Sequence, residues 1–459
     1  MSDTAAAPPP LRTFDRYWML IVILLVAVSG SIDRTILSTL GQAIKQEMRL
    51  TDAQLGWMIG PPFAIFYAAL GLPIARIAER KSRTWVIAAS VLVWSVMTTF
   101  CGFAQGFAQM FLFRIGVGVG EAGGQPASAS LISDYFPPIR RPFAFAIYGL
   151  GIPLGSMIGG IGGGWVAQHY GWRAAFFWVG VPGLILAALA AFTVKEAPRG
   201  HSEGVQVAAA PPSLAAAIKL LWAKRSFRNL LIGAALANLA TNGILPFTVP
   251  FLVRTFHLPT AKAGLLFGIV SGVAGGLGAL AGGYAATVMA KRDRRWYMFT
   301  PAIGLLLAAP VYWVAFSQGT YQAAAAVLFV AVMFHFAYTS PTYATAQNFV
   351  EPRMRASVQA ILGISMTLVG SGLGPVLSGM VSDRFATRAF TLGEYARLCP
   401  GGRPSEGALP MLVQACGKAS ATGVQQAMMC SAVLCLWAMV HYLLASRNLR
   451  EDLTPAAAA

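Results

Sequence analysis

The sequence predicts an all-α membrane protein in which twelve transmembrane helices form two pseudo-symmetric six-helix bundles. Three observations predict this fold class. Hydrophobic residues make up 56% of the 459 residues and charged residues only 11%, with a mean hydropathy of +0.61, whereas an average soluble domain has about 25% charged residues. Apolar runs long enough to span a bilayer recur along the chain, and the second half repeats motifs of the first. The composition excludes a disordered chain and a disulfide-rich secreted scaffold.

Each transmembrane helix is predicted from an apolar run of about 20 residues. The first run follows Arg12 and Arg16, and no small-residue cleavage site comes after it, so we expect a retained helix rather than a signal peptide. In chain order the predicted helices cover residues 17–40, 54–76, 84–104, 108–133, 141–166, 173–194, 227–254, 261–288, 296–317, 321–349, 355–383 and 421–445.

The helices and their connections predict five segments. The longest cytoplasmic connection contains Pro198, Pro211 and Pro212, and we expect it to include a short interfacial helix near Leu214 to Ala223. The predicted segments are a mobile N-terminal tail (1–16), an N-terminal six-helix bundle (17–194), a cytoplasmic linker (195–226), a C-terminal six-helix bundle (227–445) and a C-terminal tail (446–459).

The net charge of +17 has two interpretations. A pI near 10.1 is typical of a nucleic-acid partner, but it also results when lysine and arginine gather in the cytoplasmic loops of a membrane protein. Most of the 34 basic residues fall in the connections on the side of the N-terminus. We therefore expect a multi-pass protein of the cell inner membrane, with both termini cytoplasmic and no nucleic-acid partner.

The fifth and eleventh predicted helices carry the same residues at the same spacing. A shift of 215 positions superimposes residues 137–170 on the second half without a gap. Two parallel six-helix repeats are typical of secondary transporters, whose substrate site lies between the halves. The residues that coincide include Pro137 with Pro352, Arg140 with Arg355, Gly155 with Gly370, Ser156 with Ser371, and Gly159 with Gly374.

Three of the charged residues within the predicted membrane helices are candidates for chemistry, because an unpaired charge there costs several kcal/mol. Asp33 lies on the first helix, and Arg114 and Glu121 lie on the fourth. The seven-residue spacing puts Arg114 and Glu121 on one face, roughly 10 Å apart along the axis. Because one arginine cannot fully compensate two acids, we expect Asp33 and Glu121 to exchange protons and Arg114 to bind an anion. A static ion pair that fixes helix packing is the alternative.

Further polar residues are candidates for the substrate site. Arg34 directly follows Asp33, so it points about 100° away and is expected to serve helix packing. The candidates in the second half have helical spacing, but ordinary hydrogen bonding between helices explains any one of them equally well. The candidate substrate-binding residues are Gln125 and Ser128 on the fourth helix, Asn238 and Asn242 on the seventh, and His335, Tyr338 and Thr339 on the tenth.

Two of the five cysteines share one long polar segment between the last two predicted helices. Because this segment is expected on the non-cytoplasmic side, where disulfides persist, we expect Cys399 and Cys416 to form a disulfide. Closing a loop of about 18 residues would stabilise it by roughly 3 kcal/mol. Two free thiols in a flexible loop are the alternative.

The sequence offers no pattern typical of an enzyme. It contains no phosphate-binding G-x-x-x-x-G-K-[ST] loop, no cluster with the spacing of metal ligands and no clustered nucleophile and base. We therefore expect no catalytic residues, no metal and no cofactor. Transport would then be driven by an ion gradient or by the gradient of the substrate itself.

Two motifs resemble those of a known family. The residues from Ala75 to Arg83 resemble the loop signature of the major facilitator superfamily, Gly-x-Leu-Ala-Asp-Arg-x-Gly-Arg, with Glu79 in place of the aspartate. Within the superfamily, the chain resembles the Spinster-type lipid transporters, through Asp33-Arg34 and through Arg114 with the segment Gly118-Val119-Gly120-Glu121-Ala122.

The resemblance implies a substrate class and a gate. Spinster-type proteins translocate lysophospholipids or sphingosine-phosphate-like amphiphiles, and bacterial members are expected to be proton-coupled. The matching motif implies that the three intramembrane charges serve coupling and substrate binding. The superfamily signature also implies a cytoplasmic gate, in which Glu79 lies close to Arg353 and Arg355.

We therefore predict a secondary active transporter that works by alternating access. It is expected to be proton-coupled and to move an amphiphilic anionic lipid across the inner membrane as a monomer, with the lipid, protons and membrane lipids as its partners. The alternative is a proton-coupled organic-anion or drug transporter on the same fold. A membrane receptor is disfavoured because the sequence has no output domain, and an intramembrane lipid enzyme because it lacks a clustered nucleophile and base.

Overall fold

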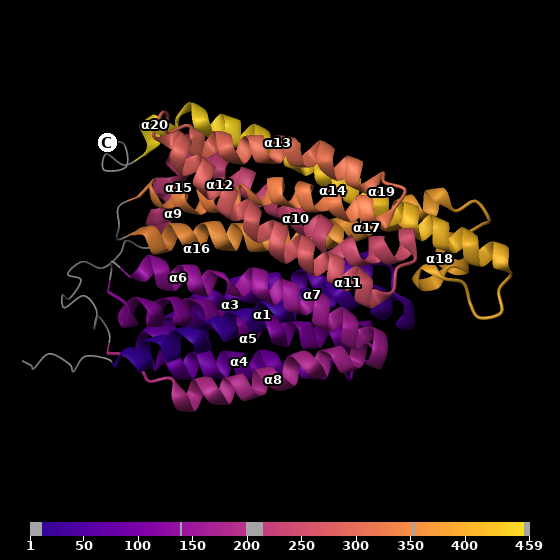
Figure 1. Cartoon of the computed structure of the whole chain (residues 1–459), viewed down its shortest axis with the longest axis horizontal. Helices are drawn as coiled ribbons and strands as arrows, with labels where there is room; N and C mark the ends of the chain where they lie inside the picture. Colours follow the sequence, from indigo (N-terminus) through magenta and orange to yellow (C-terminus); the bar gives the residue numbers. More distant parts are fainter. Residues whose placement is uncertain (1–11, 138–139, 199–213, 351–353, 454–459) are drawn as a thin grey trace, which may run out of the picture.

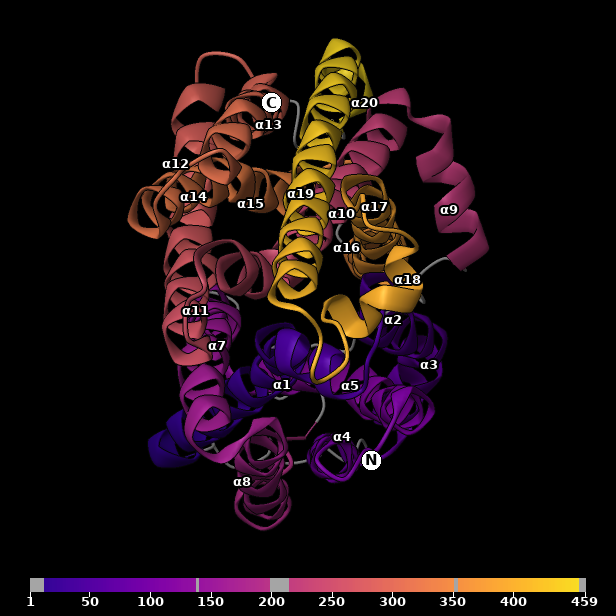
Figure 2. The same ribbon diagram turned by 90° about the vertical axis from the view of Figure 1, so that its right-hand side faces the viewer.

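The computed structural model describes residues 12–137, 140–198, 214–350 and 354–453, and these residues form helices and connecting turns without a β-strand. Figure 1 shows the N-terminal half, coloured indigo to magenta, and the C-terminal half, coloured pink to yellow, lying side by side with their helices running lengthwise. Figure 2 shows the same two halves from one end. The prediction of an all-α fold with two helical bundles is confirmed.

The two halves are built from the following helices, given in chain order. The N-terminal half consists of α1 (Thr13–Glu47), α2 (Asp52–Ile59), α3 (Pro61–Arg80), α4 (Arg83–Cys101), α5 (Phe107–Tyr135), α6 (Arg141–Gly149), α7 (Gly151–Tyr170) and α8 (Trp172–Thr193). The remaining elements are α9 (Leu214–Ala223), α10 (Arg225–Phe256), α11 (Thr260–Gly268), η1 (Ile269–Ala274), α12 (Gly275–Ala290), α13 (Trp296–Phe316), α14 (Tyr321–Phe336), α15 (Thr339–Gln347), α16 (Arg355–Ser365), η3 (Met366–Leu373), α17 (Gly374–Ala389), α18 (Tyr395–Leu398), η4 (Pro400–Gly402), α19 (Pro410–Arg447) and α20 (Leu449–Asp452).

The helices run between two ends of the molecule, which differ in what they carry. The start of α1 lies at one end together with α9 and α20, and we call this the terminal end. α18 lies at the opposite end, where a disulfide joins Cys399 to Cys416, and we call this the disulfide end. Within the described residues, eleven helical spans are long and apolar enough to cross a membrane. α5 is the twelfth long element, and it carries Arg114 and Glu121.

The helices extend further than the apolar runs that predict them. α1 begins at Thr13 and the last helix ends at Asp452, so residues 13–16 and most of 446–452 are helical rather than parts of the predicted tails. An apolar run measures the hydrocarbon core of the bilayer, whereas a helix continues beyond it wherever its backbone stays hydrogen-bonded. Residues 1–11, 199–213 and 454–459, which include most of the predicted N-terminal tail and parts of the predicted linker and C-terminal tail, lie outside the described residues.

Five of the predicted transmembrane helices are interrupted, among them the tenth, in which Ala337 and Tyr338 separate α14 from α15. Gly60 separates α2 from α3, whose first two residues are prolines, and Leu150 separates α6 from α7. In the C-terminal half, the π-helical turns η1 and η3 interrupt the eighth and eleventh predicted helices. Such π-turns often occur at functional positions, and periodicity alone did not predict them. Both adjoin the boundary between the halves, since η1 packs on α7 and η3 packs on α3 and α10.

Glycines close the boundary between the halves toward the disulfide end, where α7 packs on α11 and α2 packs on α17. A Cβ added to Gly264 would lie 2.4 Å from the backbone oxygen of Gly160, and one added to Gly56 would lie 2.2 Å from the backbone oxygen of Pro375. Neither position tolerates a side chain without movement of a helix. Small residues thus allow the helix backbones to touch, as the glycine content predicts.

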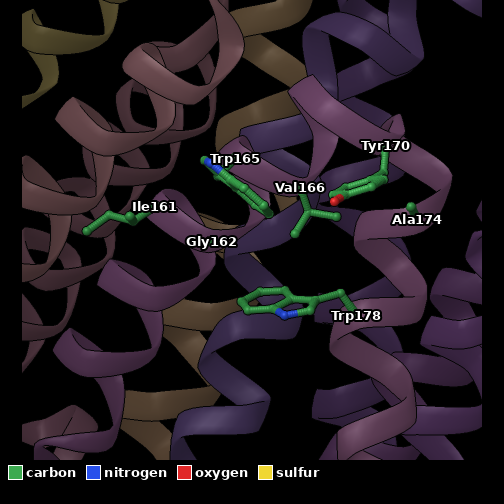
Figure 3. A pocket seen from close by; sticks show the side chains of 7 residues that line it. All are labelled: Ile161, Gly162, Trp165, Val166, Tyr170, Ala174 and Trp178. Atoms are coloured by element: carbon green, nitrogen blue, oxygen red, sulfur yellow. The ribbon is translucent and has the colours of Figure 1, made fainter.

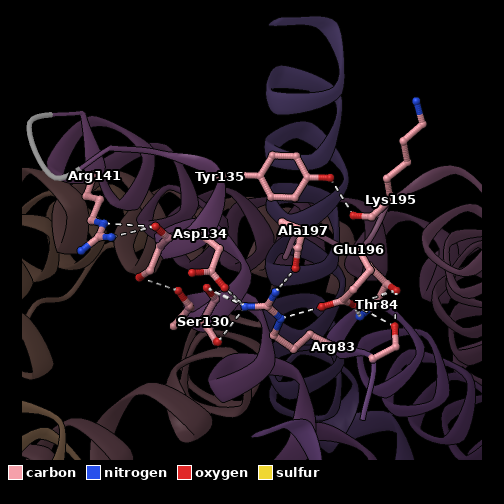
Figure 4. Close-up of polar contacts among 12 residues, drawn as sticks. Arg83, Thr84, Ser130, Asp134, Tyr135, Arg141, Lys195, Glu196 and Ala197 are labelled. Carbon is pink, nitrogen blue, oxygen red and sulfur yellow. Dashed lines mark hydrogen bonds and ion pairs between the residues drawn. The ribbon is translucent and has the colours of Figure 1, made fainter. Parts of the chain in front are cut away.

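A network centred on Arg83 ties three segments together at the terminal end (Figure 4). Arg83 donates from Nε to Glu196 at 2.7 Å and from Nη2 to the backbone oxygen of Ala197 at 2.6 Å. It also forms an ion pair with Asp134 and donates to the hydroxyl of Ser130 at 3.2 Å. The network joins the start of α4 to the end of α5 and to the segment after α8.

We expect Glu196→Gln to destabilise the protein more at neutral pH than in acid. Partial burial alone would raise the pKa of Glu196, but hydrogen bonds from the backbone N–H of Thr84 and from Arg83 outweigh it and hold the pKa below the usual value of 4.5. A carboxylate with a lowered pKa stabilises the fold above its unfolded-state pKa and loses this contribution as the pH falls. The melting temperature should therefore drop at pH 7 and approach that of the wild type near pH 4. An equal drop at both values would contradict this, and exposed Glu406→Gln is the control.

Candidate functional site

Glycines on α5 determine which of its faces meets α1. A Cβ added to Gly118 would lie 2.9 Å from the backbone oxygen of Pro62 on α3, and one added to Gly120 would lie 2.5 Å from the backbone nitrogen of Trp94 on α4. The neighbouring helices therefore pack directly on the backbone of α5 at these two positions. The face that carries Arg114 and Glu121 is left to meet α1 in the interior of the N-terminal half.

Four charged side chains from α1 and α5 lie together in this interior. Arg114 donates to the backbone oxygen of Asp33 at 3.3 Å, and Thr98 donates to the Asp33 carboxylate. Arg34 forms an ion pair with Glu121, with Nη1 3.0 Å from Oε2. We call Asp33, Arg34, Arg114 and Glu121 the charge cluster.

Both acids of the charge cluster keep one oxygen free of hydrogen bonds. Within the described part of the chain, no partner lies near Oδ2 of Asp33, Oε1 of Glu121 or Nε of Arg114, although all three atoms are buried. Asp33 is 1% exposed and Glu121 is 5% exposed. An unsatisfied buried carboxylate oxygen is costly, and adding a proton to such a carboxylate reduces this cost.

The two arginines of the charge cluster differ in their contacts and in their exposure. Arg34 was expected to serve helix packing, yet its side chain reaches Glu121 and keeps 40% of its surface exposed. Its guanidinium also lies over the ring of Phe63, 5.6 Å from the centroid. Arg114, expected to meet the anion, is only 1% exposed in this conformation. Two cations therefore face two acids, and the expected excess of acids is wrong.

The remaining candidates on α5 continue the polar face. Gln125 is exposed, and its Oε1 accepts a hydrogen bond of 2.6 Å from the hydroxyl of Tyr67 on α3. Ser128 is fully buried. Gln125 is thus accessible to a solute, whereas Ser128 is not accessible in this conformation.

The candidates in the C-terminal half bond mainly to one another and to the backbone. His335 is fully buried, with Nε2 3.1 Å from the Ala237 backbone oxygen and 3.0 Å from the Thr241 hydroxyl, and Nδ1 3.0 Å from the Tyr312 hydroxyl. Nε2 can donate while Nδ1 accepts, so the neutral ring is fully satisfied. This bonding matches the packing interpretation of His335.

The other four C-terminal-half candidates differ in exposure. Asn242 donates from its side chain to the Asn238 amide oxygen at 2.9 Å, and both residues are partly exposed. Tyr338 is 2% exposed. Thr339 is partly exposed, and its hydroxyl donates to the Phe336 backbone oxygen at 2.8 Å. The two asparagines and Thr339 are therefore the accessible polar groups of this set.

The predicted gate and an apolar hollow both lie away from the charge cluster. Arg353 and the side chains of Glu79 and Arg355 lie outside the described residues, so the predicted gate stays a prediction. An apolar hollow of about 500 Å³ lies on α7 and α8, and Figure 3 shows the side chains that line it. Its lining contains no charged residue and consists of Ile161, Gly162, Trp165, Val166, Tyr170, Ala174 and Trp178. Because this lining lacks charge, the hollow is not the candidate site.

Sequence reasoning missed a second group of buried charges at the disulfide end. Lys45 was expected after the end of the first predicted helix and Arg254 at the end of the seventh, and neither was expected to be buried. Both lie inside longer helices and contact Asp52. Thr51 and Gln54 form a capping box at the start of α2, which marks Asp52 as a first-turn residue. A capping box does not identify cations that come from elsewhere in the chain.

Comparisons with known proteins agree with the observed fold. Residues 22–375 match the Major Facilitator Superfamily. The crystal structure of a bacterial homolog of the human lysosomal transporter Spinster, inward-facing and unoccupied, is 32% identical with a TM-score of 0.87, covering 97% of this chain and 100% of that chain. An MFS-type efflux pump of Mycolicibacterium smegmatis is 32% identical, over 80% of this chain and 85% of that protein. The sphingosine-1-phosphate transporter SPNS2 of Xenopus tropicalis is 25% identical, over 78% and 73%.

Proposed function

We propose that this chain, which belongs to the Major Facilitator Superfamily, is a proton-coupled transporter of an amphiphilic anionic lipid. Membership of the family and the fold make it a multi-pass membrane transporter. The lipid substrate is supported by the similarity to the Spinster homolog and to a sphingosine-1-phosphate transporter. One chain supplies both halves, so we propose that it works as a monomer. We propose no catalytic reaction for it.

The proposed location is the cell inner membrane with both termini in the cytoplasm. The excess of lysine and arginine in the connections at the terminal end supports this orientation. The disulfide lies at the opposite end, in agreement with an oxidising compartment on that side. The state closed toward the disulfide end would then be inward-facing, as in the Spinster homolog.

The observation that carries the mechanism is the pairing of half-exposed Arg34 with buried Glu121. An anionic headgroup that enters between the halves competes with Glu121 for the guanidinium, which is suited to bidentate binding of phosphate or carboxylate. Glu121, deprived of its cation in a buried place, then takes up a proton. Substrate and proton binding are therefore linked reciprocally.

Asp33 and Arg114 form the deeper part of the charge cluster. Arg114 contacts the backbone of Asp33 and does not reach the space open to solutes in this conformation. We propose that Arg114 holds α1 and α5 in register and compensates Asp33, which is a second proton-exchanging acid. Gln125 with the partly exposed Asn238, Asn242 and Thr339 would complete the headgroup site.

We expect Arg114→Ala to abolish transport, because it leaves the buried Asp33 carboxylate without its nearby cation. Arg114→Lys keeps the charge and should retain part of the rate. Flux into liposomes measures the effect, and size-exclusion chromatography verifies that each variant is folded. A folded Arg114→Ala protein with the wild-type rate would refute the role of this residue.

The function is tested with purified protein in liposomes. Lysophospholipids, a sphingosine-phosphate and hexuronate are offered separately, with and without a pH gradient. We expect the lipids to accumulate in a way that depends on the pH gradient, and we expect no transport of hexuronate. Transport of the hexuronate or of a cationic dye, without the lipids, would favour the alternative of an organic-anion or drug transporter, which the similarity to an efflux pump supports.

A further inference from the structure

A buried ionic bridge joins the two halves at the disulfide end. Asp52 at the start of α2 lies 2.8 Å from Nζ of Lys45 on α1 and 2.7 Å from Nη2 of Arg254 on α10. The second nitrogen of the Arg254 fork donates to the other Asp52 oxygen at 2.8 Å. All three side chains are at least 96% buried. We call Lys45, Asp52 and Arg254 the bridge.

The groups around the bridge also come from both halves. Ser382 on α17 donates to Asp52 at 2.7 Å, and Gln42 on α1 accepts from Nε of Arg254 at 2.7 Å. Asp383 on α17 accepts from the backbone N–H groups of Asp52 and Ala53 at 2.9 and 2.8 Å, and so caps α2 of the other half. These hydrogen bonds form only while the two halves are in contact at this end. If the halves separated here, the bonds would break and water would replace each partner.

A short segment of the C-terminal half covers the bridge. η4 follows Cys399 directly and packs on the end of α1. A Cβ added to Gly401 would lie 3.1 Å from the backbone oxygen of Lys45, and one added to Gly402 would lie 3.6 Å from the Lys45 ammonium nitrogen. Both glycines have positive φ, 68° and 84°, which residues with a side chain rarely adopt. The chain therefore follows a path that places its backbone against the other half.

The disulfide fixes this segment to the C-terminal half. Cys399 is 2% exposed and Cys416, on α19, is fully buried. They lie in a small apolar cluster with Phe390 and Tyr395, apart from the main core. η4 is thus attached to α19 through a covalent bond immediately before it, while its glycines touch α1. We call residues 399–416 the clasp.

We propose that the clasp holds the disulfide end closed over the bridge, and that breaking the disulfide shifts the protein toward a state open at that end. Cross-linking the two cysteines, which are 17 positions apart, removes conformational freedom from the clasp before it docks on α1. Without the bond, docking on α1 must also pay the entropy of ordering this segment. The free energy of the closed state therefore rises relative to that of the open state.

The test measures the distance between the halves and needs no substrate. Gln105, in the turn between α4 and α5, and Gly319, in the turn between α13 and α14, are exposed and belong to different halves. Each is replaced by a ketone-bearing amino acid that takes a nitroxide label without thiol chemistry. Electron–electron resonance distances are recorded in lipid nanodiscs for the oxidised protein, the reduced protein and Cys399→Ser/Cys416→Ser.

We expect the longer-distance population to rise about threefold or more after reduction and in the double-serine variant. It should return to its starting value when the reduced protein is reoxidised, which excludes unfolding. Cys430→Ser/Cys435→Ser removes two thiols that are not in a disulfide and should leave the distances unchanged. Intact-mass measurement should show two hydrogens gained on reduction.

Three outcomes overturn the proposal. Identical distance distributions in the oxidised and reduced protein would show that the clasp does not bias the conformation. A mass unchanged by reduction would show that the disulfide is absent. A rise in the control variant as well would show that thiol loss acts elsewhere. None of these outcomes depends on which solute is carried. The proposal about the clasp and the proposed transport function can therefore be refuted separately.

Discussion

Glu121→Gln is expected to give a protein whose transport rate no longer responds to a pH gradient. The amide has the shape of the acid and can still accept a hydrogen bond from Arg34, but it cannot exchange a proton. Net movement down a substrate gradient should persist, since Arg34 remains 3.0 Å away and available to the anion. The measurement is the ratio of initial uptake rates with and without a pH gradient in liposomes, which should fall to about one.

The matched control for this variant is Glu47→Gln. Glu47 is an acid on the same helix as Arg34, and it pairs with Arg173 at the disulfide end, where it is 49% exposed. Neutralising it removes one acid from the chain without touching the charge cluster, so the pH response should be kept. A normal pH response in Glu121→Gln would mean that the acid is structural and that the proposed coupling is wrong.

The second large effect is expected from Arg34→Ala. If Arg34 is the cation that meets the anionic headgroup, its removal loses charge-assisted hydrogen bonds of about 1.5–3 kcal/mol, a reduction of about ten- to hundredfold in apparent affinity. Arg34→Lys keeps the charge but not the planar fork, and should lie between alanine and the wild type. Concentration dependence of uptake, measured with the best substrate of the lipid panel, separates affinity from maximal rate.

Exposed Arg384→Ala, at the end of α17, is the control for loss of a positive charge from the surface. It should leave the concentration dependence unchanged. If Arg34→Ala instead bound the lipid normally while Arg114→Ala did not, the anion would meet Arg114 in another conformation, and the assignment of the two arginines would be reversed.

The sequence was sufficient to predict the helices and the charged residues, but not the pairing of those residues. Hydropathy locates membrane helices because the bilayer demands apolar length, and burial cost identifies Asp33 and Glu121 as special. The angle between neighbouring positions separates Arg34 from Asp33 by about 100° around the helix. It did not predict that the long Arg34 side chain would reach Glu121 on another helix.

Long-range partners escaped prediction for a different reason. Asp52 and Arg254 are some 200 positions apart and meet only because α2 and α10 come from opposite halves. One sequence shows which residues are charged near a helix end, but the packing of two halves decides which of them become buried together. The π-helical turns η1 and η3 escaped likewise, because glycine-rich apolar sequence is compatible with either helical register.

The glycine contact between α7 and α11 offers a position at which one substitution could hold the protein in a single conformation. Gly160 and Gly264 leave no room between the two backbones for even one methyl group. An alanine at position 264 would therefore act as a wedge, forcing the helices apart by the width of one Cβ and disfavouring every arrangement in which they touch. Such a wedged protein would suit the selection of antibodies against the opposite conformation, and would make that conformation accessible to crystallisation without a bound solute.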